Sequence, residues 1–314
     1  MADMKKIATR ESYGKALVEL GKEHDNVVVL DADVAEATKT AYFREAFPER
    51  HIDCGIAEAN MMAIAAGMAT TGKVPFVSSF AMFAVGRAFE QVRNSVGYPH
   101  LNVKIAATHA GISVGEDGAT HQCNEDLALM RLIPGMTVIC PSDDIEAKAA
   151  IKAAYDFKGP MYMRFGRLAT PIIHEREDYH FTIGKAFLEK EGSDLTIVCC
   201  GLMVAESLAA AKILEEKGIH AEVLNMHTLK PLDAEALLAS AKKTGKVVTV
   251  EEHSIIGGLG SAVSATLGEQ LPLPCHMIGI NDVYGESGPA DQLIVKYGLD
   301  GAHIAENILK WLDK

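Results

Sequence analysis

Short apolar runs alternate with longer segments of helical periodicity along most of the chain. In the first half, runs typical of buried strands lie at 26–30, 75–79, 102–107, 136–140 and 161–165. Between them, apolar residues recur at the three- to four-residue spacing of helices, as at 57–69 and 143–155. Strands that alternate with helices form a parallel sheet covered by helices on both faces. We therefore expect an α/β domain over residues 1–168.

The alternation returns in a second, smaller unit near the end of the chain. Strand-like runs lie at 195–199, 221–224 and 247–250, and helical patterns lie at 203–217, 233–244 and 260–268. Residues 169–193 are rich in Pro, His, Glu and Lys and lack a long apolar period, which is typical of a linker. The pattern predicts two α/β domains, 1–168 and 194–314, joined by that linker.

Charge and composition narrow the function classes. The formal net charge of −12 argues against a nucleic-acid partner and against an anionic membrane surface. No apolar run is long enough to span a bilayer, and the polar start lacks the apolar core of a secretory signal. Six cysteines without Cys-x-x-Cys spacing are typical of reduced thiols. We therefore expect a cytoplasmic protein without nucleic-acid or membrane partners.

The first domain contains one conspicuously polar loop, residues 108–122, which follows a strand-like run. Three glycines in it permit positive φ or close approach of a ligand. His109, His121, Glu116 and Asp117 add groups that exchange protons or bind hydroxyls and phosphates. Loops at the carboxyl ends of strands are where α/β proteins place their sites. On composition alone, a solvated surface loop is an equally open interpretation.

Other candidate residues also allow two interpretations. Glu58 lies in the first turn of an apolar helix, where it either complements the helix dipole or forms a buried acid that shares a proton with a ligand nitrogen. Phe80 and Phe83 end a strand and fit either the core or a cofactor pocket. Arg164 and Arg167 fit surface ion pairs or a phosphate site.

Several common kinds of site are not indicated. His109 and His121 have no third ligand at a convincing spacing, so no metal site is expected. A Ser-His-Asp hydrolase is disfavoured because the chain has no Gly-x-Ser-x-Gly segment. The glycine-rich segment 257–261 does not complete Gly-x-Gly-x-x-Gly, and we interpret it as a tight turn from strand to helix.

A family resemblance joins these segments. The chain carries, in this order, Gly55-Ile56-Ala57-Glu58, Ser79-Phe80-Ala81-Met82-Phe83, Thr108-His109, Gly115-Glu116-Asp117-Gly118-Ala119-Thr120-His121-Gln122 and Phe165-Gly166-Arg167. Together they resemble the pyrimidine-binding domain of transketolases, which use thiamine diphosphate. Residues from about 190 onward, including Gly285–Ala290, are similar to the family's C-terminal domain.

The resemblance also shows what is absent. The family's diphosphate-binding domain carries a Gly-Asp-Gly segment with a downstream Asn that hold Mg²⁺ and the cofactor's phosphates, and this sequence contains no Gly-Asp-Gly. The chain therefore resembles the C-terminal subunit of a split transketolase. The resemblance implies a separate N-terminal subunit. Mg²⁺ and the diphosphate would be bound mainly by that subunit, in an α2β2 assembly.

For the cofactor, the resemblance assigns four residues. Glu58 is expected to hydrogen-bond N1′ of the aminopyrimidine and favour the imino tautomer that activates the thiazolium carbon. Phe80 and Phe83 are expected to pack against the pyrimidine ring. Arg87, which follows Gly86, is also expected to contact the cofactor, and it is reminiscent of deoxyxylulose phosphate synthases.

For the substrate, the resemblance implies two groups of residues. His121 and Asp117 would bind the carbonyl and hydroxyl groups of a ketose donor. His109, Arg167 and Arg164 would hold the sugar phosphate. The implied reaction, typical of the pentose phosphate pathway, moves a two-carbon ketol unit from a ketose phosphate to an aldose phosphate.

Two departures from the family pattern leave the sugars open. Gly86 stands where many transketolases have a pocket Tyr, and Ala37 stands where a phosphate-contacting Ser is common. Alternatives are therefore a relative with an unusual sugar donor, a ligase of the deoxyxylulose phosphate synthase type, and a non-catalytic regulatory subunit of the same fold.

Overall fold

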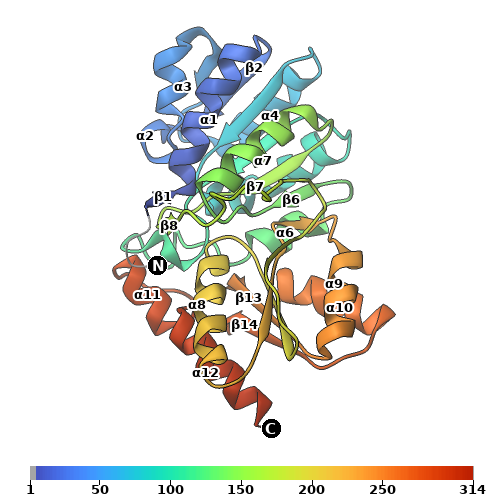
Figure 1. The fold of residues 1–314 in the computed structure, drawn as a ribbon. Helices are drawn as coiled ribbons and strands as arrows, with labels where there is room; N and C mark the ends of the chain where they lie inside the picture. The colour runs from blue at the N-terminus through green and yellow to red at the C-terminus, as the bar shows by residue number, and fades with distance from the viewer. Residues whose placement is uncertain (1–4, 314) are drawn as a thin grey trace.

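The computed structural model describes residues 5–313. Figure 1 shows two α/β domains, one above the other, with the chain passing from the upper to the lower. This confirms the two-domain α/β fold expected from the alternating pattern.

The first domain is built on a seven-stranded sheet of order β12-β6-β7-β5-β4-β2-β3. Its strands are β2 (Val27–Asp31), β3 (His51–Asp53), β4 (Val74–Ser78), β5 (Lys104–Ala107), β6 (Thr137–Ile139), β7 (Met161–Arg164) and β12 (Thr228–Lys230). All neighbours are parallel except β12, which runs antiparallel to β6 at the edge.

Successive residues of a strand point to opposite faces of the sheet, so a continuous apolar strand makes both faces apolar. Helices cover both faces of this sheet. In β2, Val27 and Val29 join the core under α1 and α7, whereas Val28 and Leu30 join the core under α4 and α6. The helices are α1 (Thr9–Glu23), α2 (Ala35–Thr38), α3 (Ala41–Ala46), α4 (Glu58–Ala69), α5 (Phe89–Gln91), α6 (Asp126–Leu132) and α7 (Asp144–Asp156). Two π-helical turns, Met82–Arg87 and Val92–Gly97, flank α5.

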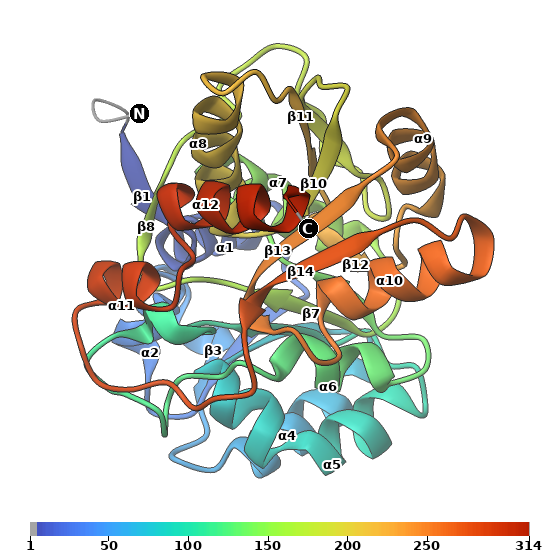
Figure 2. The same ribbon diagram turned by 90° about the horizontal axis from the view of Figure 1, so that it is seen from below.

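The second domain has a five-stranded sheet of order β14-β13-β10-β11-β9. Its strands are β9 (Phe187–Lys190), β10 (Leu195–Cys199), β11 (Ala221–Asn225), β13 (Val247–Ser254) and β14 (Cys275–Ile280), and only β9 is antiparallel. Helices α8 (Met203–Glu215), α9 (Ala234–Thr244), α10 (Leu259–Gln270), α11 (Ala290–Lys296) and α12 (Gly301–Leu312) surround it, as Figure 2 shows. At the turn 257–261, the Glu251 carboxylate accepts hydrogen bonds from Leu259 N and Gly260 N at 2.7 and 2.8 Å. This agrees with a strand-to-helix turn.

The segment interpreted as a linker, 169–193, is more structured than its composition indicates. It begins with β8 (Ala169–Pro171), which pairs with β1 (Lys6–Ala8), and it contains the edge strand β9. The boundary is also crossed in the other direction, because β12 belongs by sequence to the second domain and by pairing to the first. Neither feature follows from the local pattern of apolar residues.

A buried ionic cluster fixes this segment. His174 Nε2 lies 2.7 Å from Glu189 Oε1, and its Nδ1 lies 3.1 Å from Asp143 Oδ1 at the start of α7. The imidazole also stacks on Tyr179 with the ring centroids 3.9 Å apart. Burial alone would lower the pKa of His174, but the two carboxylates raise it to about 10. The cluster therefore links both domains through a charged histidine.

Two further findings concern the cysteines and the length of the apolar helices. The six cysteines are free thiols. Among residues 5–313, no helix combines the length and apolarity that crossing a membrane requires.

Candidate active site

The segments that carry the candidate residues meet at one edge of the first sheet. Phe80 follows β4, His109 follows β5 and Arg167 follows β7, and these three strands are adjacent and parallel. The carboxyl ends of parallel strands lie at the same sheet edge, so residues far apart in the sequence converge there. The amino end of α4 brings Glu58 to the same region.

Glu58 is a buried acid and not a solvated one. It begins α4, and its side chain is only 3% exposed. Arg87 Nη1 donates a hydrogen bond to Glu58 Oε2 at 2.8 Å, while the Arg87 side chain is 51% exposed. The π-helical turn Met82–Arg87 carries both Phe83 and Arg87, and the guanidinium carbon lies 4.7 Å from the Phe83 ring centroid. Among residues 5–313, the side-chain partner of this buried carboxylate is thus a half-exposed cation, with which water can compete.

The two phenylalanines form part of the site. Phe80 stacks on His109 with ring centroids 3.9 Å apart and an interplanar angle of 20°. Phe83 meets His121 edge-on at 5.2 Å and lies 6.3 Å from Phe80. Both phenylalanines remain partly exposed. They therefore connect the region of Glu58 with the two histidines and still offer aromatic surface.

His109 is held as a neutral imidazole. Its Nε2 lies 2.9 Å from Arg10 Nη1, and its Nδ1 lies 2.8 Å from Thr108 Oγ1. Arg10 can only donate, so Nε2 accepts and Nδ1 carries the proton. Burial lowers the pKa of His109 to about 3, with further contributions from Arg10, Arg167 and His121. Its φ of 55° is rare for a residue with a side chain and holds the ring against Phe80.

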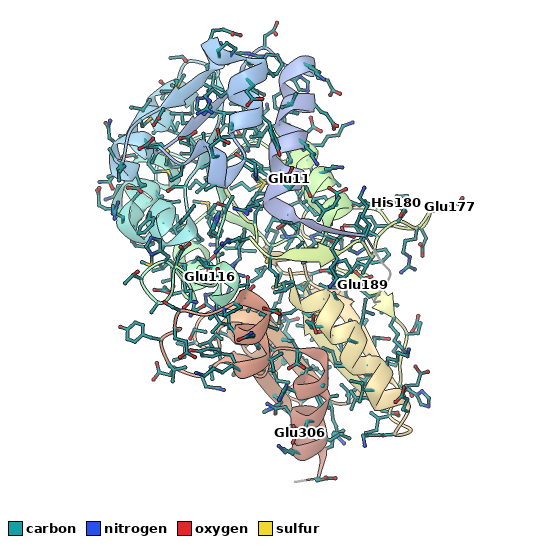
Figure 3. All side chains as sticks on the ribbon, turned by 90° about the vertical axis from the view of Figure 1, so that its left-hand side faces the viewer. Glu11, Glu116, Glu177, His180, Glu189 and Glu306 are labelled. Carbon is teal, nitrogen blue, oxygen red and sulfur yellow. The ribbon has the colours of Figure 1, made fainter. Side chains whose placement is uncertain are left out.

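Arg167 and the polar loop form an exposed ionic group. Arg167 Nη1 lies 3.2 Å from Glu116 Oε2 and 3.9 Å from Asp117 Oδ2, and it also donates to Val114 O. All three charged side chains are at least one-third exposed, so the pairs are weak and can exchange. Glu116, labelled in Figure 3, lies where the two domains meet. His121 Nδ1 lies 2.9 Å from Thr120 Oγ1 in the same loop.

Arg164 does not join this group. Its side chain is 6% exposed and contacts the Asp126 carboxylate with Nε–Oδ2 at 2.8 Å and Nη2–Oδ1 at 3.3 Å. Tyr162 donates to the same carboxylate at 2.6 Å, and Arg164 Nη2 donates to Glu252 O at 2.8 Å. Arg164 is the last residue of β7 and points under α6, whereas Arg167 lies beyond the strand end. The structure thus places Arg164 in a buried junction between the domains and not in a phosphate site.

Arg10 is a site residue that the sequence did not indicate. It lies in the first turn of α1 and donates to Ala37 O at 2.9 Å as well as contacting His109. Thr9 Oγ1 accepts from Gly166 N at 2.8 Å, which fixes the start of α1 beside the end of β7. Burial and the neighbouring Arg167 lower the pKa of Arg10. No local motif marks an arginine that reaches the site from a distant helix.

Comparison with known proteins assigns the family. Residues 5–172 match the family described as transketolase, pyrimidine binding domain, and residues 184–304 match transketolase, C-terminal domain. The chain is 52% identical to a putative transketolase C-terminal section of Methanocaldococcus jannaschii, over 97% of this chain and 96% of that protein. It is 47% identical to a 6-deoxy-6-sulfo-D-fructose transketolase subunit of Clostridium sp. strain MSTE9, over 94% of this chain and 91% of that protein.

A solved structure agrees with these relatives. The chain is similar to a split gene transketolase described as an inactive beta4 tetramer, with a TM-score of 0.88 and 52% sequence identity. The match covers 98% of both chains. This protein therefore belongs to the transketolase family and combines its pyrimidine-binding and C-terminal domains. The resemblance inferred from the sequence motifs is confirmed.

Proposed function

We propose that this chain is the subunit of a split transketolase that binds the aminopyrimidine ring of thiamine diphosphate together with the sugar. The complete enzyme would transfer a two-carbon ketol unit from a ketose phosphate to an aldose phosphate. The observation that carries the proposal is Glu58, an acid only 3% exposed that begins a helix beside partly exposed aromatic rings. A buried acid in such a setting can share a proton with a ring nitrogen of a ligand.

The residues present fit the ring of this cofactor. The nearly buried carboxylate of Glu58 can hydrogen-bond a protonated ring nitrogen. Phe80 and Phe83 offer aromatic surface for the ring itself. Arg87 can leave Glu58 at little cost because its guanidinium is half exposed. When bound, the cofactor supplies a nucleophilic carbon on which the donor's carbon–carbon bond is broken. In that complex Glu58 would hold a proton at N1′, and the phenylalanines would exclude water.

The sugar side of the site would be formed by the polar loop and two arginines. Asp117 and His121 offer exposed acceptors and donors for hydroxyl and carbonyl groups. Arg10 and Arg167 flank the neutral His109 and place positive charge where a phosphate would bind. Arg167 would exchange its weak carboxylate contacts for a phosphate, which guanidinium groups bind in bidentate fashion.

The remaining part of the cofactor site is assigned to a second polypeptide. The chain lacks the family's Gly-Asp-Gly segment, and residues 5–313 contain no group of three or more His, Cys, Asp or Glu that could hold a metal ion. We therefore assign Mg²⁺ and the diphosphate to an N-terminal subunit, in an α2β2 assembly. The beta4 tetramer of a related split transketolase supports contacts between copies of the C-terminal subunit.

An unusual sugar donor is a second candidate. The relative from Clostridium is named for 6-deoxy-6-sulfo-D-fructose and is 47% identical to this chain. A sulfonate, like a phosphate, presents several anionic oxygens to Arg10 and Arg167, so this charge pattern serves either group. The phosphate site alone therefore does not select between the two kinds of ketose.

Reconstitution tests the proposal. The purified chain is combined with the subunit from the same organism that carries Gly-Asp-Gly, together with thiamine diphosphate and Mg²⁺. Xylulose 5-phosphate and 6-deoxy-6-sulfofructose are offered as donors with ribose 5-phosphate as acceptor, and products are identified by mass spectrometry. Transfer by the complex with either donor supports the proposal. Absence of transfer with every ketose contradicts ketol transfer, and full turnover by the chain alone contradicts the divided site.

A further inference from the structure

The polar loop has one face turned to the second domain, and its glycines line that face. Gly111, Gly115 and Gly118 have φ of 76°, 87° and 74°. A Cβ on Gly111 would collide with the Glu252 carboxylate, and one on Gly118 would collide with Ser287 Oγ. Both positive φ and close approach therefore require glycine at these positions. The three glycines mark the side of the loop that the second domain covers.

Specific contacts fix this side of the loop. Ser113 N donates to Glu252 Oε1 at 2.7 Å, and Glu252 is 5% exposed in β13. Ile112 is fully buried and belongs to the apolar core of the second domain. The loop thus extends from the strand-end site of the first domain, while the Ile112 side chain and the Ser113 backbone amide anchor it in the second domain.

Gln122 closes the loop at its other end. Its side chain is 3% exposed, and Nε2 lies 3.1 Å from Ile112 O and 2.9 Å from Glu286 O in the second domain. A Cβ on Gly285 would collide with Gln122 Oε1, so the amide fits against a residue without a side chain. One amide therefore joins both ends of the loop to the segment 285–290.

The opposite face of the loop carries the candidate sugar-binding groups. Glu116, Asp117, Ala119 and Thr120 are exposed, and His121 is partly exposed. His121 directly precedes Gln122, so a backbone shift that follows the loss of the Gln122 anchor would also displace the imidazole. Displacements of about 1 Å at groups that orient a substrate can lower rates by about 100-fold.

We propose that Gln122 is a positioning residue, which holds the loop 111–122 on segment 285–290 and thereby orients Asp117 and His121 toward the sugar. This inference rests on the proposed function. It gives the C-terminal domain a role in orienting the sugar-binding loop. The ring-binding groups Glu58, Phe83 and Arg87 lie on helices of the first domain. Loss of the amide should therefore weaken sugar turnover and leave cofactor affinity unchanged.

A double-mutant cycle in the reconstituted complex tests this role. Gln122→Ala removes the amide, and Gly285→Ala adds a methyl group that pushes it away. Each variant should lower kcat/KM for the ketose by roughly 10- to 100-fold, with an unchanged Kd for thiamine diphosphate measured by fluorescence titration. The double variant should equal Gln122→Ala alone, because the added methyl no longer meets a side chain. Gln292→Ala, an exposed glutamine on α11, is the matched control and should behave as wild type.

Other outcomes would overturn the inference. Wild-type kcat/KM in Gln122→Ala, additive losses in the double variant, or an equal loss of cofactor affinity would each contradict a positioning role. Hydrogen exchange on the chain alone provides a readout that does not need activity. Residues 113–122 should exchange faster in Gln122→Ala than in wild type, and unchanged exchange would overturn the anchoring. If the wild-type complex transfers no ketol unit, the proposed function fails while the exchange experiment still decides whether Gln122 anchors the loop.

Discussion

Replacing Glu58 with Gln would separate stability from activity, because the substitution keeps the shape of the side chain and removes its charge. The ion pair that is lost joins Glu58 Oε2 to Arg87 Nη1 at 2.8 Å, but Arg87 is half exposed. Solvent screening limits such a pair to about 1 kcal/mol, and a neutral amide is easier to bury than a carboxylate. The free energy of unfolding should therefore change by less than about 1 kcal/mol.

The effect of Glu58→Gln on turnover should be much larger. An amide cannot hold a proton at N1′, and losing a proton-transferring group of this kind lowers rates by about 10³-fold, which corresponds to about 4 kcal/mol. Initial rates of the reconstituted complex give the activity, and urea unfolding of the chain alone gives the stability. Glu90→Gln is the matched control, because Glu90 is an exposed glutamate on the nearby α5.

Two results would refute this reasoning. Near-normal turnover in Glu58→Gln would remove the residue from catalysis. A loss of about 3 kcal/mol or more in unfolding free energy, of the size seen when a buried ion pair loses one partner, would make the carboxylate a structural group.

Three further outcomes are expected. Arg10→Ala should raise KM for a phosphorylated ketose by roughly 10-fold or more and leave KM for an unphosphorylated ketose unchanged. It should also raise the pKa of His109, measured by NMR titration. Equal effects on the KM of both ketoses would contradict a phosphate-binding role for Arg10. His174→Gln should destabilise the chain by about 3 kcal/mol at pH 6, and because the folded pKa of His174 is raised to about 10, this difference should shrink as the pH rises from 6.5 toward 10. Urea unfolding at both pH values measures it, and a constant difference would contradict the charged histidine. The chain alone, with cofactor and Mg²⁺, should show no ketol transfer in a coupled assay; turnover there would place the whole site in one polypeptide.

The sequence predicts the fold well where structure is local. Continuous apolar runs such as Val27–Leu30 predict strands buried on both faces, and the structure shows their residues alternating between two cores. Strand β9 and strand β12 could not be predicted in this way. Both are short antiparallel edge strands whose pairing depends on partners far away in the chain.

The candidate site was likewise predictable from the sequence only in part. The sequence motifs included Glu58, Phe80 and His109. Phe80 and His109 meet because the adjacent parallel strands β4 and β5 end at the same edge, and Glu58 reaches that region from the start of α4. Arg164 was expected beside a phosphate, but side-chain direction at the end of β7 turns it to a buried aspartate. Arg10 was not predicted, because its approach depends on how α1 packs across the sheet.

The edge strand β12 has a consequence for how the molecule is made. The first sheet is completed only by Thr228–Lys230, which the ribosome adds after three strands of the second sheet already exist. A fragment that stops before this point would leave β6 with an unpaired edge, open to association with other chains. The apolar cluster whose buried members run from Val28 to Leu267 spans both halves in the same way. The two domains are thus expected to mature and unfold together, as one cooperative unit rather than as two modules joined by a hinge.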